Sequence, residues 1–322
     1  MACLHSWKTF LTGAIAVVFL ALLPLLADMG DDTMNLLIML FIYIILAESW
    51  NLMGGYTGLY NIGMAAFFGC GVLITHFVLI AGAPLYIAVL GGAVSAVLLA
   101  GVIGIPTLKL KGFYFSIATL ALAEVLRITV GNLFPRTVWM PSEWFVNFNF
   151  IPRYYLSLGM AVITVLIMYI LVNSKLGLAL FAIRDDEEAA KVSGINVFKY
   201  KIIVFFISSF LTGLAGGIYT YYRLSFLPFS QFTPHWTFEP LMAASIGGAG
   251  TILGPVLGSI LLVVIQDWFS LNLGQAHYIV LGTIFILMVI FSPGGIIQLV
   301  NKAYHISGLY KVRKKRNRVE LF

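Results

Sequence analysis

The chain has 322 residues, of which 61% are hydrophobic and only 10% are charged. Soluble domains carry roughly 25% charged and 45–50% apolar residues, so this composition excludes a cytosolic enzyme, a secreted domain and a disordered chain. Two cysteines, Cys3 and Cys70, provide no disulfide framework. A membrane-spanning helix needs about 20 mainly apolar residues, so the chain has room for about ten spans. The composition predicts a polytopic membrane protein with a net charge of +6.

Ten apolar runs follow one another along the chain. They cover residues 10–27, 34–53, 62–81, 85–106, 113–130, 154–172, 202–222, 238–246, 252–269 and 278–291. None shows the alternation of a membrane barrel, and open sheets do not occur in lipid, so the runs predict an all-α fold. We expect a single transmembrane domain over residues 1–322, with a loop at 175–201 and a basic tail at 296–322.

Lysine and arginine side chains gather in alternate loops. Lys8 precedes the first run, Lys109 and Lys111 follow the fourth, and residues 175–201 hold five further cations. The short loop after the first run carries acidic but no basic side chains. Because basic loops stay in the cytoplasm, both termini and the 175–201 loop are predicted there. This orientation requires the weak run at 238–246 to cross the membrane, whole or as a broken helix. A basic tail beside a span favours anionic lipid over nucleic acid as its partner.

Two glycine-rich breaks resemble each other, one at residues 54–58 and one at 247–251. Paired breaks in two halves of a membrane protein point to a transport pathway, although both are also compatible with ordinary tight turns. Acidic side chains within spans are further pathway candidates. One of them, Glu124, can be neutralised by Arg127, three residues later on the same helix face. The candidates taken from these features are Gly54, Gly55, Gly58, Glu124, Glu239, Gly247, Gly248 and Gly250. Small residues at every fourth position from Ala88 to Gly104 predict close helix packing.

The 175–201 loop contains a pattern typical of a short capped helix. Asp185 is predicted as its N-cap, with Glu188 as the capping-box partner and Gly194 just beyond its end. The expected helix has about two turns and offers Ala189, Ala190 and Val192 as small apolar contacts. Such a helix fits a groove on a partner, or is simply solvated.

No motif of an enzyme is present. The sequence lacks HExxH, G-x-S-x-G and the phosphate-binding G-x-x-x-x-G-K-[ST], so the chain is predicted not to hydrolyse ATP. Its histidines show no metal-ligand spacing, and no bound cofactor or metal is expected. Active transport by this chain would therefore draw on an ion gradient or on another subunit.

The loop also carries a family resemblance. Glu188, Ala189, Ala190 and Gly194 resemble the EAA-type coupling loop of ABC importer permeases, and the block at 173–196 is similar to the branched-chain amino acid permease family, in particular its LivM-type subunit. Further matching segments lie at residues 65–69, 108–120, 247–258 and 291–295.

The resemblance implies an ABC importer permease bundle with a cytoplasmic coupling helix in a bacterial inner membrane. The implied ATPase-coupling residues are Arg184, Asp185, Glu188, Ala189, Ala190 and Gly194. The implied partners are a second permease subunit, two ATP-binding subunits that hold ATP and Mg, and a periplasmic substrate-binding protein. The implied cargo is a branched-chain or related neutral amino acid.

One segment departs from the family pattern. The family often has a Gln-x-Ser-x-Gly-His sequence where this chain has Leu59, Asn61, Gly63 and Met64. Asn61 and Met64 therefore join the pathway candidates, and urea, short amides or aromatic acids remain alternative cargoes. A stand-alone secondary transporter is a further alternative, which the scattered acidic residues favour less.

Overall fold

The computed structural model describes residues 13, 15, 17–24, 30–110, 112–141, 144, 148–274, 277–291 and 294–298. Within them, nine of the ten apolar runs correspond to helices. These are α2 (Asp31–Gly54), α3 (Met64–Ile80), α4 (Leu85–Thr107), α5 (Phe113–Leu133), α7 (Phe150–Val172), α10 (Val197–Tyr222), α11 (His235–Gly247), α12 (Leu253–Leu273) and α13 (His277–Phe291). Of the first run, residues 13, 15 and 17–24 are described and are helical, whereas the basic tail beyond residue 298 lies outside the described residues.

The all-α membrane architecture is confirmed. Six of the described helices are long and apolar enough to cross a membrane, and α3 is a shorter apolar helix. The strands in the described residues are two residues long, β1 (Val138–Trp139) and β2 (Ser225–Phe226), and they pair antiparallel.

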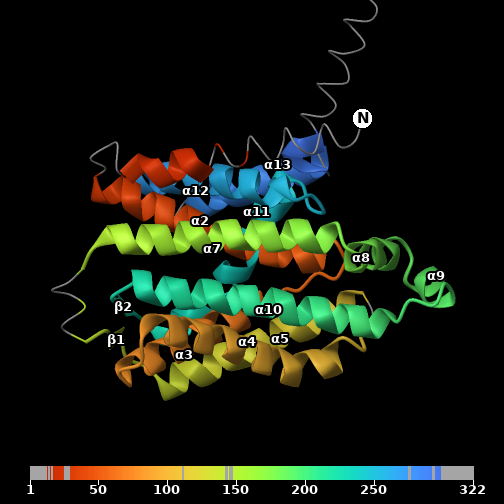
Figure 1. The fold of residues 1–322 in the computed structure, drawn as a ribbon, viewed down its shortest axis with the longest axis horizontal. Helices are drawn as coiled ribbons and strands as arrows, with labels where there is room; N and C mark the ends of the chain where they lie inside the picture. Colours follow the sequence, from red (N-terminus) through yellow and green to blue (C-terminus); the bar gives the residue numbers. More distant parts are fainter. Residues whose placement is uncertain are drawn as a thin grey trace, which may run out of the picture.

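The long helices lie side by side along one axis (Figure 1). Helix α2 is the most buried of the membrane-length helices and packs against α7, α10, α11 and α12. Helix α10 packs against α3 and α4 on another side of the bundle. A central, almost fully buried helix explains why the 34–53 run is apolar on every face.

The small-residue ladder of α4 forms its buried face. Its five members, Ala88, Gly92, Ala96, Ala100 and Gly104, are all buried. Opposite them on α10, a Cβ at Gly213 would lie 2.5 Å from the Ala96 Cβ and 3.0 Å from the Gly92 carbonyl oxygen. The predicted close packing is confirmed, because only small residues let these two backbones approach so closely.

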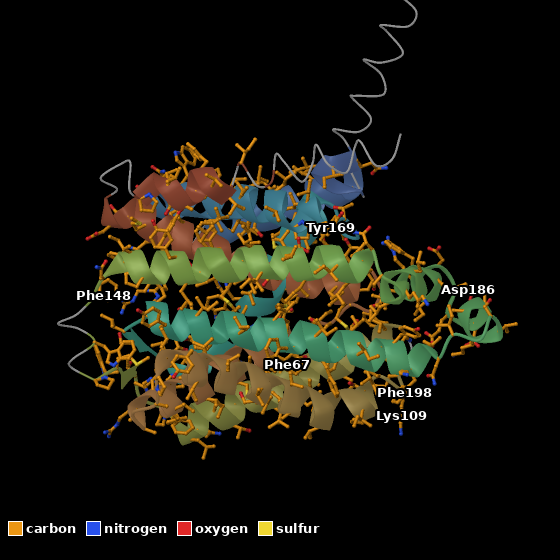
Figure 2. The ribbon with its side chains drawn as sticks, in the orientation of Figure 1. Phe67, Lys109, Phe148, Tyr169, Asp186 and Phe198 are labelled. Carbon is orange, nitrogen blue, oxygen red and sulfur yellow. The ribbon has the colours of Figure 1, made fainter. Side chains whose placement is uncertain are left out.

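The two ends of the bundle differ. Helices α8 (Lys175–Asp185) and α9 (Glu187–Val192) project beyond α7 and α10 at one end, called here the α9 end (Figure 1). Lys109, Asp186 and Phe198 lie at the α9 end, whereas Phe148 lies at the opposite end with β1 and β2 (Figure 2). Lys109 and the 175–201 loop thus share one end, as the predicted alternation of spans requires.

The weak run at 238–246 lies within one short helix, α11. After β2 the chain forms a short 3-10 helix, η1 (Pro228–Phe232), and then α11, which ends beside the α9 end. With 13 residues, α11 is about 20 Å long, less than the roughly 30 Å of a hydrocarbon core. It is not among the six described helices long enough to span a membrane, so its crossing stays a prediction.

Candidate transport and coupling site

The two glycine breaks contact each other at the α9 end. The Asn51 side chain joins them, since its Oδ1 accepts from the Gly250 N–H at 2.8 Å and its Nδ2 donates to the Thr251 carbonyl at 2.9 Å. A Cβ at Gly55 would lie 2.5 Å from the Gly250 nitrogen. The end of α2 and the turn between α11 and α12 are therefore in direct backbone contact.

Arg184 of α8 inserts at the same point. Its Nη1 donates to the Gly55 carbonyl oxygen at 2.5 Å. Gly250 has a φ of +82°, and a Cβ there would overlap the Arg184 guanidinium. We call the set Asn51, Gly55, Arg184, Gly250 and Thr251 the glycine junction. The glycine junction links the 175–201 loop to both glycine breaks, which are far apart in the sequence.

Asn51 is a site residue that the sequence analysis missed. It lies within the second apolar run, three residues before the first glycine break. A buried amide in a mainly apolar membrane helix needs polar partners nearby. This requirement could have marked Asn51 as a candidate from the sequence, although it does not identify the residue that Asn51 contacts.

The N-cap of α9 is Asp186, so the assignment to Asp185 was wrong by one residue. The Asp186 Oδ1 accepts from the backbone N–H groups of Glu188 at 2.9 Å and Ala189 at 3.1 Å. Asp186 is extended, with φ of −156°, and this separates α9 from α8, where Asp185 is the last residue. Glu188 bonds Lys191 at 3.3 Å.

The end of α9 is as predicted. Gly194 has a φ of +84° and directly follows the C-cap residue Ser193. Side-chain caps also begin the neighbouring helices: Ser174 Oγ accepts from the Leu176 N–H and Asn196 Oδ1 from the Lys199 N–H, both at 3.1 Å. Each helix start in the loop is therefore stabilised by a side chain from the loop itself.

The apolar side chains of α9 point in two directions. Ala190 is only 3% exposed and packs with Ile183 and Val197 in a small core of the loop. Ala189 is exposed, and Val192 is 90% exposed. Of the three expected contact residues, Ala190 therefore faces inward, and Ala189 and Val192 remain on the outer surface.

An ion-pair network fastens α9 to α10. The Glu187 carboxylate lies 2.6 Å from Lys201 Nζ and 3.2 Å from Lys191 Nζ. Burial alone would raise the pKa of Glu187, but hydrogen bonds and the positive charges of both lysines outweigh it, so the pKa is lowered. The charged form of Glu187 is thus favoured in the folded loop.

The chain between the first break and α3 is not helical. Its backbone is satisfied by side chains: Trp50 Nε1 donates to the Asn61 carbonyl at 3.1 Å, Ser116 Oγ to the Tyr60 carbonyl at 2.7 Å, and Thr119 Oγ1 accepts from the Ile62 N–H at 3.3 Å. Irregular backbone at membrane depth needs such partners or a cavity.

Within this segment the side chains have separate roles. Asn61 and Met64 are buried, and Asn61 Oδ1 accepts from the Gly63 N–H at 3.0 Å. Tyr60 is 56% exposed. Asn61 therefore shapes the segment from within, and Tyr60 presents the outward surface.

Glu239 lies in a buried polar network between α2, α11 and α12. Tyr43 donates its hydroxyl to the Glu239 carboxylate, His235 Nδ1 lies 3.1 Å from it, and Gln266 Nε2 donates to it at 3.1 Å. These partners reduce the cost of placing a carboxylate among apolar helices. The network does not include the glycine junction.

Glu124 lies on α5 and is held by Arg127, whose Nε donates to both carboxylate oxygens at 3.0 and 2.9 Å. The predicted pairing is confirmed. Both side chains remain partly exposed, Glu124 at 39% and Arg127 at 32%. Among the described residues, no group of three or more His, Cys, Asp or Glu side chains is placed to hold a metal ion.

Membrane-length apolar helices and a polar loop at one end together define a multi-pass membrane protein. The profile of the family described as "Branched-chain amino acid transport system / permease component" matches residues 33–290. The chain belongs to this family.

Relatives over most of the chain are named as branched-chain amino acid permeases, and a shorter match is named for ribose. The high-affinity branched-chain amino acid transport system permease protein LivM of Escherichia coli K12 is 26% identical, over 88% of this chain and 74% of that protein. The probable branched-chain amino acid transport permease protein LivM of Methanocaldococcus jannaschii is 26% identical, over 84% and 94%. The ribose import permease protein RbsC of E. coli K12 is 31% identical over 37% of this chain and 38% of that protein.

Proposed function

We propose that this chain is a permease subunit of an ATP-driven ABC importer that moves branched-chain or closely related neutral amino acids across a bacterial inner membrane. The family and the names of its relatives support this cargo class. The complete bundle has about ten spans, both termini in the cytoplasm, and residues 1–322 form one permease domain. It works with a second permease subunit, two ATP-binding subunits and a periplasmic substrate-binding protein. ATP and Mg bind to the ATP-binding subunits, and this chain itself is not an enzyme.

The glycine junction is the observation that carries the proposal. In the proposed mechanism α9 is the cytoplasmic coupling helix, and its outer surface at Ala189 and Val192 docks on an ATP-binding subunit. Closure of the ATP-binding subunits displaces α8 and α9 together. Arg184 passes this displacement to Gly55 and Gly250, because its guanidinium lies against both.

The two breaks are the moving parts of the pathway in this proposal. Turns without helical hydrogen bonds bend more easily than the helices they join, so α2 and α12 can tilt about them. The proposed coupling residues are Arg184, Asp185, Glu188, Ala189, Ala190 and Gly194. The proposed pathway residues are Gly54, Gly55, Gly58, Asn61, Met64, Glu124, Glu239, Gly247, Gly248 and Gly250.

Reconstituted transport tests the proposal. The chain is co-expressed with a second permease, ATP-binding subunits and a binding protein, sought among the genes that neighbour its own, and leucine uptake is measured in proteoliposomes with ATP on the side of the ATP-binding subunits. Uptake that requires both ATP and the binding protein supports the importer. Uptake driven by a proton or sodium gradient without ATP refutes it. Uptake of urea or short amides in place of leucine retains the importer and overturns the cargo.

A further inference from the structure

We propose that one edge of α5 recognises the two charged ends of a zwitterionic amino acid. The Glu124 carboxylate receives the ammonium group and the Arg127 guanidinium receives the carboxylate. The edge consists of Leu120, Glu124, Arg127 and Gly131 and is called here the α5 edge. This inference rests on the proposed function and adds the chemistry by which the cargo is held on its way through the membrane.

The depth of the ion pair is the first argument. Helix α5 has 21 residues and is about 31 Å long, so it spans a hydrocarbon core. Glu124 and Arg127 lie close to its midpoint, and neither side chain is fully covered by the rest of the chain. Charged side chains at this depth are costly against acyl chains and face a bundle interior or a water-filled cavity instead. The α5 edge therefore does not face lipid.

The pattern around α5 separates this edge from the other surfaces of the helix. The spacing of four, three and four residues from Leu120 to Gly131 places them on one strip. Ile117, three residues before Leu120, and Ile128, four residues after Glu124, are exposed on the same side of α5 as the strip. Val125 and Thr129 are exposed on a different side of the helix. The charged pair is therefore bordered by apolar side chains and confined to one side of α5.

Both ends of the strip meet segments that are not α-helical. Near one end, Ser116 holds the carbonyl of Tyr60, whose ring is largely exposed. At the other end Gly131 lies against Phe229 of η1, where an added Cβ would be 3.4 Å from the phenylalanine Cβ. Along the helix, Leu120 on one side and Phe229 near Gly131 on the other thus flank the charged pair. This combination matches a solute with one charged pair and an apolar side chain.

The charge arrangement selects a zwitterion over other small solutes. Glu124 and Arg127 are three residues apart, so their positions differ by about 4.5 Å along the helix axis. A zwitterion aligned antiparallel places each of its charges next to the opposite one. A solute with a single charge is repelled by the side chain that carries the same sign. Urea or an amide carries no charge, so it gains hydrogen bonds but no attraction between opposite charges. Because the pair already neutralises itself, binding is weak, as a pathway that must release its cargo requires.

Accessibility of single cysteines tests where the edge faces. In the complete complex, with Cys3 and Cys70 replaced by serine, Leu120→Cys and Gly131→Cys are compared with Val125→Cys and Thr129→Cys, which lie on a different side of α5. We expect a membrane-impermeant, charged thiol reagent to label the first two faster, and excess leucine to slow that labelling. Equal labelling of all four, or labelling that leucine does not change, overturns the inference. Protection of Leu120→Cys by the second permease subunit alone overturns it as well.

Charge substitutions test recognition itself. Glu124→Gln and Arg127→Gln should each raise the KM for leucine uptake about tenfold, the loss expected for one hydrogen bond to a charged group. Copurification of the ATP-binding subunits should not change. The reversed pair, Glu124→Arg with Arg127→Glu, keeps an internal ion pair and should recover part of the lost affinity. An unchanged KM in both single variants refutes the inference while wild-type uptake still supports the importer. Failure of the wild-type complex to transport leucine would instead refute the proposed function.

Discussion

Replacing Gly250 by alanine should damage coupling more than the same change at a matched glycine. Gly250 and Gly82 have nearly identical φ values, +82° and +84°. A Cβ at Gly82, in the turn between α3 and α4, meets nothing within 4 Å, whereas a Cβ at Gly250 overlaps the Arg184 guanidinium. The two substitutions share the backbone strain and differ in what the new methyl group displaces.

The expected free energies follow from these contacts. A positive φ costs a residue with a Cβ about 1–2 kcal/mol, so both substitutions should lower the free energy of unfolding by this amount. Gly250→Ala also drives Arg184 off the Gly55 carbonyl. Arg184 is otherwise exposed and water replaces part of that bond, so the additional loss is about 1 kcal/mol. Gly250→Ala should therefore cost about 2–3 kcal/mol in total.

The assay combines stability with transport. Thermal unfolding of the purified complex reports the stability of each variant, and leucine uptake per ATP hydrolysed reports coupling. We expect Gly82→Ala to lower stability slightly and leave that ratio unchanged. Gly250→Ala should lower both the stability and the uptake per ATP hydrolysed, while the ATP-binding subunits should still copurify.

A double-mutant comparison isolates Arg184 as the cause. In an Arg184→Ala background no guanidinium remains to be displaced, so Gly250→Ala should cost less than it does with Arg184 present, and the excess over Gly82→Ala should fall to that of the 3.0 Å approach to the Gly55 carbonyl oxygen. If Gly250→Ala costs the same with and without Arg184, or if the two glycine variants couple equally well, the assigned role of the glycine junction is wrong.

Three further predictions concern the 175–201 loop. Val192→Asp should reduce copurification of the ATP-binding subunits with an intact loop, whereas Ala190→Asp places a carboxylate in the small core and should make the loop sensitive to limited proteolysis. Asp186→Ala should destabilise α9 by about 1 kcal/mol in hydrogen exchange, while Asp185→Ala should have little effect, and equal effects would contradict the assigned cap. Because the pKa of Glu187 is lowered in the folded loop, its ion pairs are formed above the ordinary glutamate pKa of about 4.3 and are lost as the pH falls through the lower folded value. Amide protection of α9 should therefore decline at acidic pH in the wild type, and Glu187→Gln should remove that dependence.

The membrane helices could be predicted because length and apolarity alone specify them. The 85–106 run, for example, became α4 with its start at the predicted residue. Local chemistry was predicted less exactly. Asp185 and Asp186 are equally good caps by residue type, and only the extended backbone at Asp186 decides between them. Similarly, nothing in the sequence of α9 shows that Ala190 packs on Ile183 while Val192 does not.

The glycine junction could not have been predicted from the sequence. Asn51 and Gly250 are 199 residues apart, and a repeated glycine pattern carries no information about distance. Their contact depends on how α2, α11 and α12 pack together. Asn61 illustrates the same limit, since its amide shapes the backbone at Gly63. A polar residue near a break can serve local structure instead of lining a pathway.

The way the 175–201 loop is built has a consequence for how such a protein can be redesigned. The loop contains its own helix caps at Ser174, Asp186 and Asn196 and its own apolar cluster around Ala190. Its shape is therefore encoded largely by its own sequence, while Arg184 and Leu180 attach it to the bundle, where Leu180 packs with Leu52 and Met53. In the proposed importer, a loop of this kind could be exchanged between relatives if these two contacts are kept. Such an exchange would change the ATP-binding partner without altering the cargo.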